Sequence, residues 1–310
     1  MTGGEDERPY LLGVAQDGVV SRAQLDVLGV TRWRIRDEVR ARRWRLVGRQ
    51  CVVLHRGPLT REAKEWVAVL EHGQGAALAA HTAAARYGMT GFDSELVQIV
   101  VHRGARTRSF PWLKVHESRR FDPATDVHPA RTPRIVSLER AIVDMACWSR
   151  SPRRACAILC AAVQQRLTVA PRLRDELDGA GRVRHHRLLR AVLTDIEGGS
   201  HALSELDMLA LCRRAGLPEP RRQAVRRDAA GRRRYLDLEV VLADGTVLVI
   251  EVDGAAHLQP LTWWDDQLRQ NLIVIDGSSV MRFPAAIARL DPGLVIDQLR
   301  QMAAHHVLAA

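Results

Sequence analysis

The chain has 310 residues, of which 46% are hydrophobic and 26% charged, and its formal net charge is +10. This composition is typical of a globular protein with two or three domains. No apolar run approaches the roughly 20 residues that span a bilayer, and the polar N-terminus does not resemble a signal peptide, so we expect no membrane segment. The five cysteines are odd in number and lack CxxC spacing, which argues against a zinc site and fits a reducing cytoplasm.

The excess positive charge lies in the N-terminal two-thirds of the chain. Residues 204–310 contain 13 Arg against 14 Asp and Glu, so residues 1–203 contain the other 33 basic and 22 acidic residues. A basic N-terminal part joined to a neutral part that contains candidate carboxylate ligands is typical of a nucleic-acid-binding domain attached to a metal-dependent domain. Basicity alone would also fit a ribosomal or membrane-surface protein.

The first predicted domain, residues 1–58, has the pattern of a winged helix-turn-helix. Ser21 and Thr31 are typical helix N-caps, Gly29 and Val30 lie at the turn between the two helices that follow them, and Gly48-Arg49 separates two strands of a hairpin. The predicted elements are helices at 8–16, 22–28 and 32–42 and hairpin strands at 44–47 and 50–54.

The third of these helices is the expected recognition helix. Arg32, Arg34 and Arg36 lie near its N-terminal end, where such helices meet base edges and phosphates. We therefore predict DNA contact by these three arginines. The alternative is a packing module with an arginine-rich solvent face, or a protein-binding winged helix.

This segment resembles the N-terminal domain of AbiEi-type antitoxins. The similarity rests on Gly-Val-Val-Ser-Arg-Ala-Gln-Leu at residues 18–25, on Gly-Val-Thr at 29–31 and on the wing, and it covers under a fifth of the chain. The run at residues 132–146 is similar to a segment that commonly follows that winged helix. The resemblance implies a DNA-binding regulator with a cognate toxin as its partner.

The second predicted domain, residues 59–198, has a mixed α+β pattern and no recognisable catalytic constellation. Its histidines are scattered, and we interpret them as surface or core residues rather than metal ligands. A helix at 188–196 followed by Gly198-Gly199 marks its end. The other predicted elements are helices at 60–71, 76–86, 137–147 and 153–165 and strands at 97–102 and 113–116.

The third predicted domain, residues 199–310, alternates between helix and strand signals. Seven arginines lie on and around its first predicted hairpin, and among them Arg222 and Arg227 are candidate contacts to a phosphate backbone; the alternative is a solvated edge protected by charge. The predicted elements are a helix at 201–215, strands at 223–227, 232–242 and 246–253, a helix at 263–272, a strand at 279–283 and a helix at 292–306.

The hairpin at residues 235–257 is the most informative stretch. A three-residue loop, Ala243-Asp244-Gly245, fixes the register so that Asp237 lies opposite Glu251, with Asp253 on the same face. Like charges set opposite one another destabilise a sheet, so three converging carboxylates indicate a site for Mg²⁺ or Mn²⁺. The alternative is an ordinary solvated strand face.

The spaced motifs of this domain resemble a domain of unassigned function related to the very-short-patch repair (Vsr) endonucleases, which have the PD-(D/E)XK nuclease fold. They are Ser204-Glu205, Asp237, Glu251-Val-Asp-Gly-x-x-His257, Asp266-x-x-Arg269 and Val280-Met-Arg282-Phe, and they cover roughly a third of the chain. The helix-strand-strand-strand-helix-strand order is the core of that fold.

The resemblance assigns a role to each matching residue. It implies that Asp237 and Glu251 are metal ligands, with Glu205 of the first helix as a further ligand. Asp253, also a candidate ligand, stands where many members of the superfamily have a catalytic lysine, and His257 matches a histidine that acts as general acid or base. Arg269 and Arg282 would direct positive charge toward phosphate, or would pair with nearby carboxylates, Arg282 with Glu251.

The sequence thus predicts a multidomain α+β protein of the cytoplasm that binds DNA. The first hypothesis is a metal-dependent DNA endonuclease or nickase acting in defence or repair. The alternative is a non-enzymatic regulator similar to AbiEi antitoxins, in which a nuclease fold is retained as a scaffold. A toxin-binding protein without DNA contact is a third, weaker hypothesis.

Overall fold

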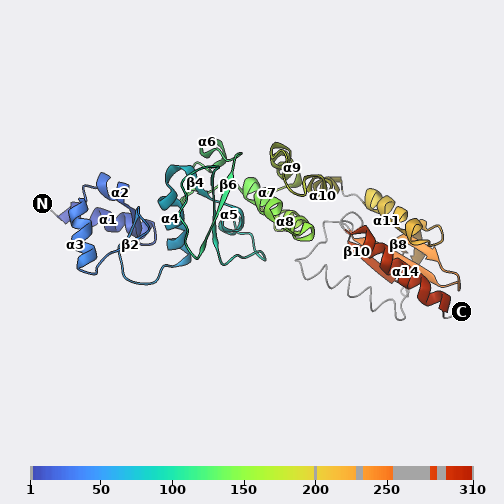
Figure 1. Ribbon diagram of the computed structural model, residues 1–310. Helices are drawn as coiled ribbons and strands as arrows, with labels where there is room; N and C mark the ends of the chain where they lie inside the picture. Colours follow the sequence, from blue (N-terminus) through green and yellow to red (C-terminus); the bar gives the residue numbers. More distant parts are fainter. Residues whose placement is uncertain (1–2, 199–200, 228–232, 254–279, 285–290, 309–310) are drawn as a thin grey trace. The chain divides into compact units, whose positions relative to one another are not determined.

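The computed structural model describes residues 3–198, 201–227, 233–253, 280–284 and 291–308 (Figure 1). The predicted α+β class is confirmed, because the described residues form both helices and small sheets. The chain divides into two compact units, Met1–Met145 and Ala146–Ala310. No helix in the described ranges has the length and apolar character needed to cross a membrane.

The N-terminal module, residues 3–54, has the predicted order of helices and hairpin. Its two predicted caps are confirmed: Ser21 forms a reciprocal capping box with Gln24, and the Thr31 hydroxyl accepts from the backbone N–H of Arg34 at 3.2 Å. The elements are α1 (Gly3–Ala15), β1 (Val19–Ser21), α2 (Arg22–Val27), α3 (Arg32–Arg40), β2 (Arg45–Val47) and β3 (Cys51–Val53).

The sheet of this module contains a strand that the sequence pattern did not reveal. β1 pairs antiparallel with β3, which also pairs with β2, so the sheet order is β1-β3-β2. Trp44, fully buried, packs with Leu25 and Ile35 in the core on one side of this sheet. The small sheet therefore fixes α3 on the module and leaves the opposite face of that helix exposed.

The tip of the β2–β3 hairpin is attached to the next helix, α4 (Arg61–His72). The buried carboxylate of Glu71 accepts hydrogen bonds from the backbone N–H groups of Arg49 and Gln50, at 2.6 and 2.8 Å. Gly48 has a φ of +69°, and a Cβ there would lie 2.5 Å from the Glu71 carboxyl carbon. Glycine is thus required at this turn by its backbone conformation and by the close approach of Glu71.

Substituting Gly48 by Ala should destabilise unit 1 more than the same change at Gly29. Both residues have positive φ, which costs a non-glycine residue about 1–2 kcal/mol, but a Cβ at Gly29 meets nothing within 4 Å. Urea denaturation of Gly48→Ala and Gly29→Ala would measure the difference. Equal losses for the two variants would mean that the Glu71 carboxyl group moves aside for the added Cβ without cost.

The rest of unit 1 contains a second three-stranded sheet with order β4-β5-β6, in which β5 and β6 are parallel. The prediction of one helix over residues 76–86 is wrong in its first turn, since Ala76–Leu78 form β4, buried and paired antiparallel with β5. Alanine favours helix, and sheet pairing overrides that preference here. The elements are η1 (Gly73–Gly75), β4 (Ala76–Leu78), α5 (Ala80–Arg86), β5 (Val97–His102), β6 (Leu113–Ser118), α6 (Pro123–Asp126) and α7 (Leu138–Trp148).

A buried charge cluster holds α7 to the segment that precedes it. Arg140, 2% exposed, donates to Asp144 at 2.6 Å and to Asp126 of α6 at 2.8 Å. Arg120 donates to the second carboxylate oxygen of Asp144 at 2.9 Å. Each buried charge here depends on an opposite charge in direct contact, so the cluster joins three segments of unit 1.

The cysteines behave as core residues, as their spacing indicated. All five are buried thiols that are not joined in disulfides. Burial raises the pKa of the Cys212 thiol to about 12, so this side chain stays protonated and acts as a small apolar group.

In the described part of unit 2, helices α8 to α11 precede a mixed sheet, and α14 follows it. The predicted order after residue 200 is helix, three strands, helix, strand, helix. The first and last helices and all four strands are confirmed, with bounds close to those expected, and the predicted helix at 263–272 lies outside the described residues. The helix α9 was not predicted. The elements are α8 (Pro152–Gln164), α9 (Ala170–Gly179), α10 (His186–Gly198), α11 (His201–Ala215), β7 (Arg221–Arg227), β8 (Arg233–Val241), β9 (Val247–Asp253), β10 (Val280–Pro284) and α14 (Pro292–Leu308).

The order of the described strands in this sheet is β10-β9-β8-β7. β7, β8 and β9 pair antiparallel in sequence, whereas β10 pairs parallel with β9. The long helices α11 and α14 pack against each other, and α11 also contacts β8 and β9. β9 is thus an interior strand, and its residues are positioned by a neighbour on each side.

Candidate functional site

The β8–β9 hairpin has the predicted loop and register. Leu242 and Thr246 pair at its end, and Gly245 has a φ of +85°. The carboxylate of Asp244 accepts from the backbone N–H of Thr246 at 2.8 Å, which stabilises the turn. The strand pairing runs from Val241 opposite Val247 to Leu238 opposite Ile250.

The two faces of this hairpin have different character, as predicted. Leu238, Val240, Leu248, Ile250 and Val252 are all buried and form the core face. The opposite face carries Glu239 and Glu251, and we call it the carboxylate face. Glu239 is only 8% exposed and Glu251 is half-buried, so this face is not a freely solvated strand surface.

The register brings the positions of the predicted metal ligands together. The last pair of this register is Leu238 opposite Ile250. The next residues along β8 and β9 are Asp237 and Glu251, so their backbone positions lie opposite each other. Asp253 ends β9, where its Cα pairs with Pro284 of β10. Glu205 lies in the first half of α11. The side chains of Asp237, Asp253 and Glu205 lie outside what the structure describes, as do His257 and Arg269 altogether.

Glu251 has a cationic neighbour on the parallel strand. Arg282 of β10 is the Cα partner of Glu251, and its Nε donates to Glu251 Oε2 at 2.5 Å. The two side chains are 48% and 31% exposed, respectively. Arg282 was expected either to pair with Glu251 or to direct positive charge toward phosphate. Both roles are compatible with this geometry, since a guanidinium that pairs with Glu251 also places positive charge at the carboxylate face.

The argument for a divalent cation at the carboxylate face rests on where two acidic residues lie on neighbouring strands, and not on a described group of metal-binding side chains. Among the side chains that the structure describes, no three Asp, Glu, His or Cys residues gather as a metal-binding group. The carboxyl oxygens that hard cations prefer would come from Asp237 and Glu251, which the register sets side by side on neighbouring strands. This donor chemistry suits Mg²⁺ or Mn²⁺.

A second candidate site is the exposed face of α3 in the N-terminal module. Arg32 and Arg36 are exposed, and their guanidinium carbons lie 4.6 and 4.7 Å from the ring centroid of Trp33. Trp33 is 53% exposed, so its indole is accessible on this face of the helix together with the two guanidinium groups. Arg34 is half-buried, so the outer face of α3 presents Arg32 and Arg36 more than Arg34.

Two further predicted DNA contacts, Arg222 and Arg227, lie on β7 of the four-stranded sheet. The Cα atom of Arg222 pairs with that of Leu238, and the Cα atom of Arg227 with that of Arg233. Since β7 is the last described strand in the order β10-β9-β8-β7, these arginines belong to a sheet edge.

Two features of these sites were not among the sequence predictions. The first is the role of Trp33, although one aromatic residue between two arginines on a helix is itself a signal for cation–π stacking. The second is the burial of Glu239, which is among the buried charged residues of the described chain. The burial of Glu239 could have been predicted only from the position of β8 inside the sheet, with β7 and β9 on its two sides.

Comparisons with protein-family models and with curated proteins found no match to this chain.

Proposed function

We propose that this protein binds duplex DNA through the N-terminal module and cleaves it at the carboxylate face of the C-terminal sheet. The N-terminal module would be a winged helix related to that of AbiEi-type antitoxins, and the C-terminal domain a Vsr-like PD-(D/E)XK nuclease. The observation that carries the proposal is the hairpin register, which sets the positions of Asp237 and Glu251 side by side.

The topology of the C-terminal sheet supports this assignment. Three antiparallel strands follow α11, and a fourth strand returns parallel to the third, with α14 after it. Apart from the predicted helix at 263–272, which lies outside the described residues, this succession of elements is the one that the resemblance to Vsr-related domains implies. In a sheet of this kind, residues of the second and third strands bear the ligands, as Asp237 and Glu251 would here.

Each residue of the proposed site would have one task. Asp237 and Glu251, with Asp253 or Glu205, would hold the ion, and Mg²⁺ there would supply Lewis-acid stabilisation of phosphate charge. Arg282, paired with Glu251, would contact a phosphate oxygen at the edge of the site. His257 would exchange a proton with the attacking water or the leaving group.

A non-enzymatic regulator is the second candidate, and one contact favours it. Arg282 already neutralises Glu251 in the structure, as a structural ion pair would. Asp253 stands where a catalytic lysine is expected, and a carboxylate cannot supply that positive charge. The two candidates differ in one result: only the first predicts cleavage of DNA in the presence of Mg²⁺.

Both candidates predict salt-dependent DNA binding by α3. Replacing Arg32, Arg34 and Arg36 by Ala should weaken binding of the full chain to a fluorescent duplex and flatten the dependence of log Kd on log salt. Each lost phosphate contact reduces that slope by about 1, since fewer counterions are released. Fluorescence anisotropy at several NaCl concentrations measures both quantities.

The matched control replaces three exposed arginines elsewhere in the chain, Arg150, Arg172 and Arg187, so that the change in net charge is the same. If the control triple variant lowers affinity and slope as much as the α3 variant, the effect belongs to net charge and α3 is not the DNA-binding surface. Under the nuclease proposal, the α3 variant should also cut DNA more slowly at low protein concentration and keep its Mg²⁺ requirement.

A further inference from the structure

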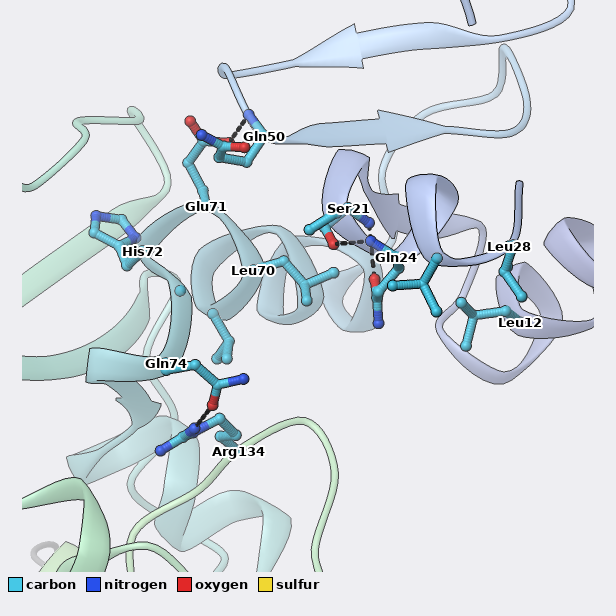
Figure 2. Close-up of a pocket in the computed structure, with 14 residues that line it drawn as sticks. Leu12, Ser21, Gln24, Leu28, Gln50, Leu70, Glu71, His72, Gln74 and Arg134 are labelled. Atoms are coloured by element: carbon cyan, nitrogen blue, oxygen red, sulfur yellow. Dashed lines mark hydrogen bonds between the residues drawn. The ribbon is translucent and has the colours of Figure 1, made fainter. Parts of the chain in front are cut away.

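A pocket of about 650 Å³ lies between the N-terminal module and the C-terminal half of α4 (Figure 2). This volume is in the range of about 300–1,000 Å³ that small-molecule sites occupy. The pocket is distinct from both sites described above, because its walls come from α1, α2, α4 and η1 and from the segment around Arg134.

Much of the pocket wall is apolar and accessible. Leu12, Leu28 and Leu70 line it and are half-buried, and Val27 at its rim is 87% exposed. Figure 2 shows Leu12 and Leu28 from the N-terminal module on one side and Leu70 of α4 facing them. Burying these side chains under a ligand would remove apolar surface from water, so an apolar group is favoured in this part of the pocket.

Polar groups on the α4 side are already engaged by the protein. The Glu71 carboxylate accepts from two backbone N–H groups of the hairpin tip, with Arg108 at 4.0 Å. His72 contacts Ala68 O through Nδ1 at 2.7 Å and accepts from the backbone N–H of Arg108 through Nε2 at 2.9 Å. Both ring nitrogens of His72 are therefore engaged by the protein, and the Glu71 carboxylate, which can only accept hydrogen bonds, would not bind an anion.

Arg134 differs from these groups. Among the described residues its guanidinium donates to Oε1 of Gln74, a neutral partner, and its buried Nε has no acceptor. In Figure 2 the Arg134–Gln74 pair lies well apart from Glu71. Arg134 is half-buried at the pocket wall, and its hydrogen-bond partner among the described residues is neutral. A carboxylate or sulfonate in the pocket could therefore form a charge-assisted hydrogen bond with its terminal guanidinium nitrogens.

We propose that this pocket binds a small organic acid, with its apolar body over Leu12, Val27, Leu28 and Leu70 and its anionic group at Arg134. The site is independent of DNA binding and cleavage. Its ligand would contact the N-terminal module and α4 together, so binding should stabilise unit 1 against unfolding.

The full-length protein can be tested with 8-anilinonaphthalene-1-sulfonate, a fluorescent probe that combines an apolar body and one anion. We expect saturable binding that decanoate displaces and that decanol displaces about tenfold less well, because the alcohol lacks the charge. Arg134→Gln should raise the Kd of the probe about tenfold, and Arg134→Lys should restore part of the affinity. Ala23→Trp, at an exposed position lining the pocket, should block binding by filling the space.

Arg131→Gln is the matched control, since Arg131 is exposed, lies three residues from Arg134 and stacks on Tyr87 instead. It should leave the Kd within about twofold of wild type. Absence of probe binding to the wild-type chain, or an unchanged Kd in both Arg134→Gln and Ala23→Trp, would overturn the proposal. If Arg134→Gln does not fold, judged by circular dichroism, Ala23→Trp alone decides.

Discussion

Replacing Glu251 by Gln should lower the rate of DNA cleavage by roughly 100-fold or more while the protein stays folded. The amide keeps the size of the side chain and removes the negative charge that a hard cation requires, so several kcal/mol of metal-derived stabilisation would be lost. Initial rates of plasmid nicking at saturating Mg²⁺ measure the effect, and circular dichroism confirms folding.

Glu219→Gln is the matched control for this substitution. Glu219 is also a glutamate of unit 2 that pairs with an arginine, because Arg213 donates to both of its carboxylate oxygens. The Arg213 guanidinium lowers the pKa of Glu219, so Glu219 is charged at neutral pH. If Glu251→Gln and Glu219→Gln both cleave like wild type, the Glu251–Arg282 pair is structural and the nuclease proposal fails.

Arg140→Ala should be strongly destabilising, with a loss of about 3–5 kcal/mol in the free energy of unfolding. Its removal leaves the buried carboxylate of Asp144 with Arg120 as its remaining described cation, and takes from the half-buried Asp126 the guanidinium that donates to it. Denaturation in urea, followed by circular dichroism, measures the loss. Arg131→Ala, which removes an exposed guanidinium 4.2 Å from the Tyr87 ring, should cost about 1 kcal/mol or less.

The two results together test whether the cluster at Arg140 holds unit 1 together. A loss below about 1 kcal/mol for Arg140→Ala, the value typical of surface pairs, would mean that water replaces the guanidinium without cost. The cluster would then have no part in fixing α7.

The elements that could be predicted are those whose signals are local. Ser21 and Thr31 cap helices through contacts within three residues, and Gly245 sets a hairpin register through a turn conformation that few other residues adopt. The face of each strand then follows from the alternation of apolar and charged residues. For this reason the C-terminal sheet agrees with its predicted strands almost residue by residue.

The elements that could not be predicted depend on distant partners. The strand at Ala76–Leu78 exists because β5 and the segment at Ile135 pair with it, and nothing in three small apolar residues shows those partners. The contact of Glu71 with the hairpin tip joins residues 21 and 22 positions apart. Such contacts are fixed by tertiary packing rather than by a local pattern.

In the candidate sites, too, the features set by local sequence could be predicted and those set by distant contacts could not. The opposition of Asp237 and Glu251 follows from the loop length, whereas the partner of Glu251 depends on how β10 returns to the sheet. The pairing of Arg282 with Glu251 was one of two alternatives in the sequence, and the parallel register of β9 and β10 brings the two residues together. The stacking of Arg32 and Arg36 on Trp33 likewise required the positions of the side chains on α3.

Cleavage of supercoiled plasmid DNA by the purified full-length protein tests the central claim most directly. The protein is first freed of metal with EDTA and then assayed with no added metal, with Mg²⁺ and with Mn²⁺. We expect open-circular or linear product only when one of the two ions is present, with loss of that product when EDTA is added again. DNA that is bound but stays intact under all these conditions would contradict the nuclease proposal and leave the regulator.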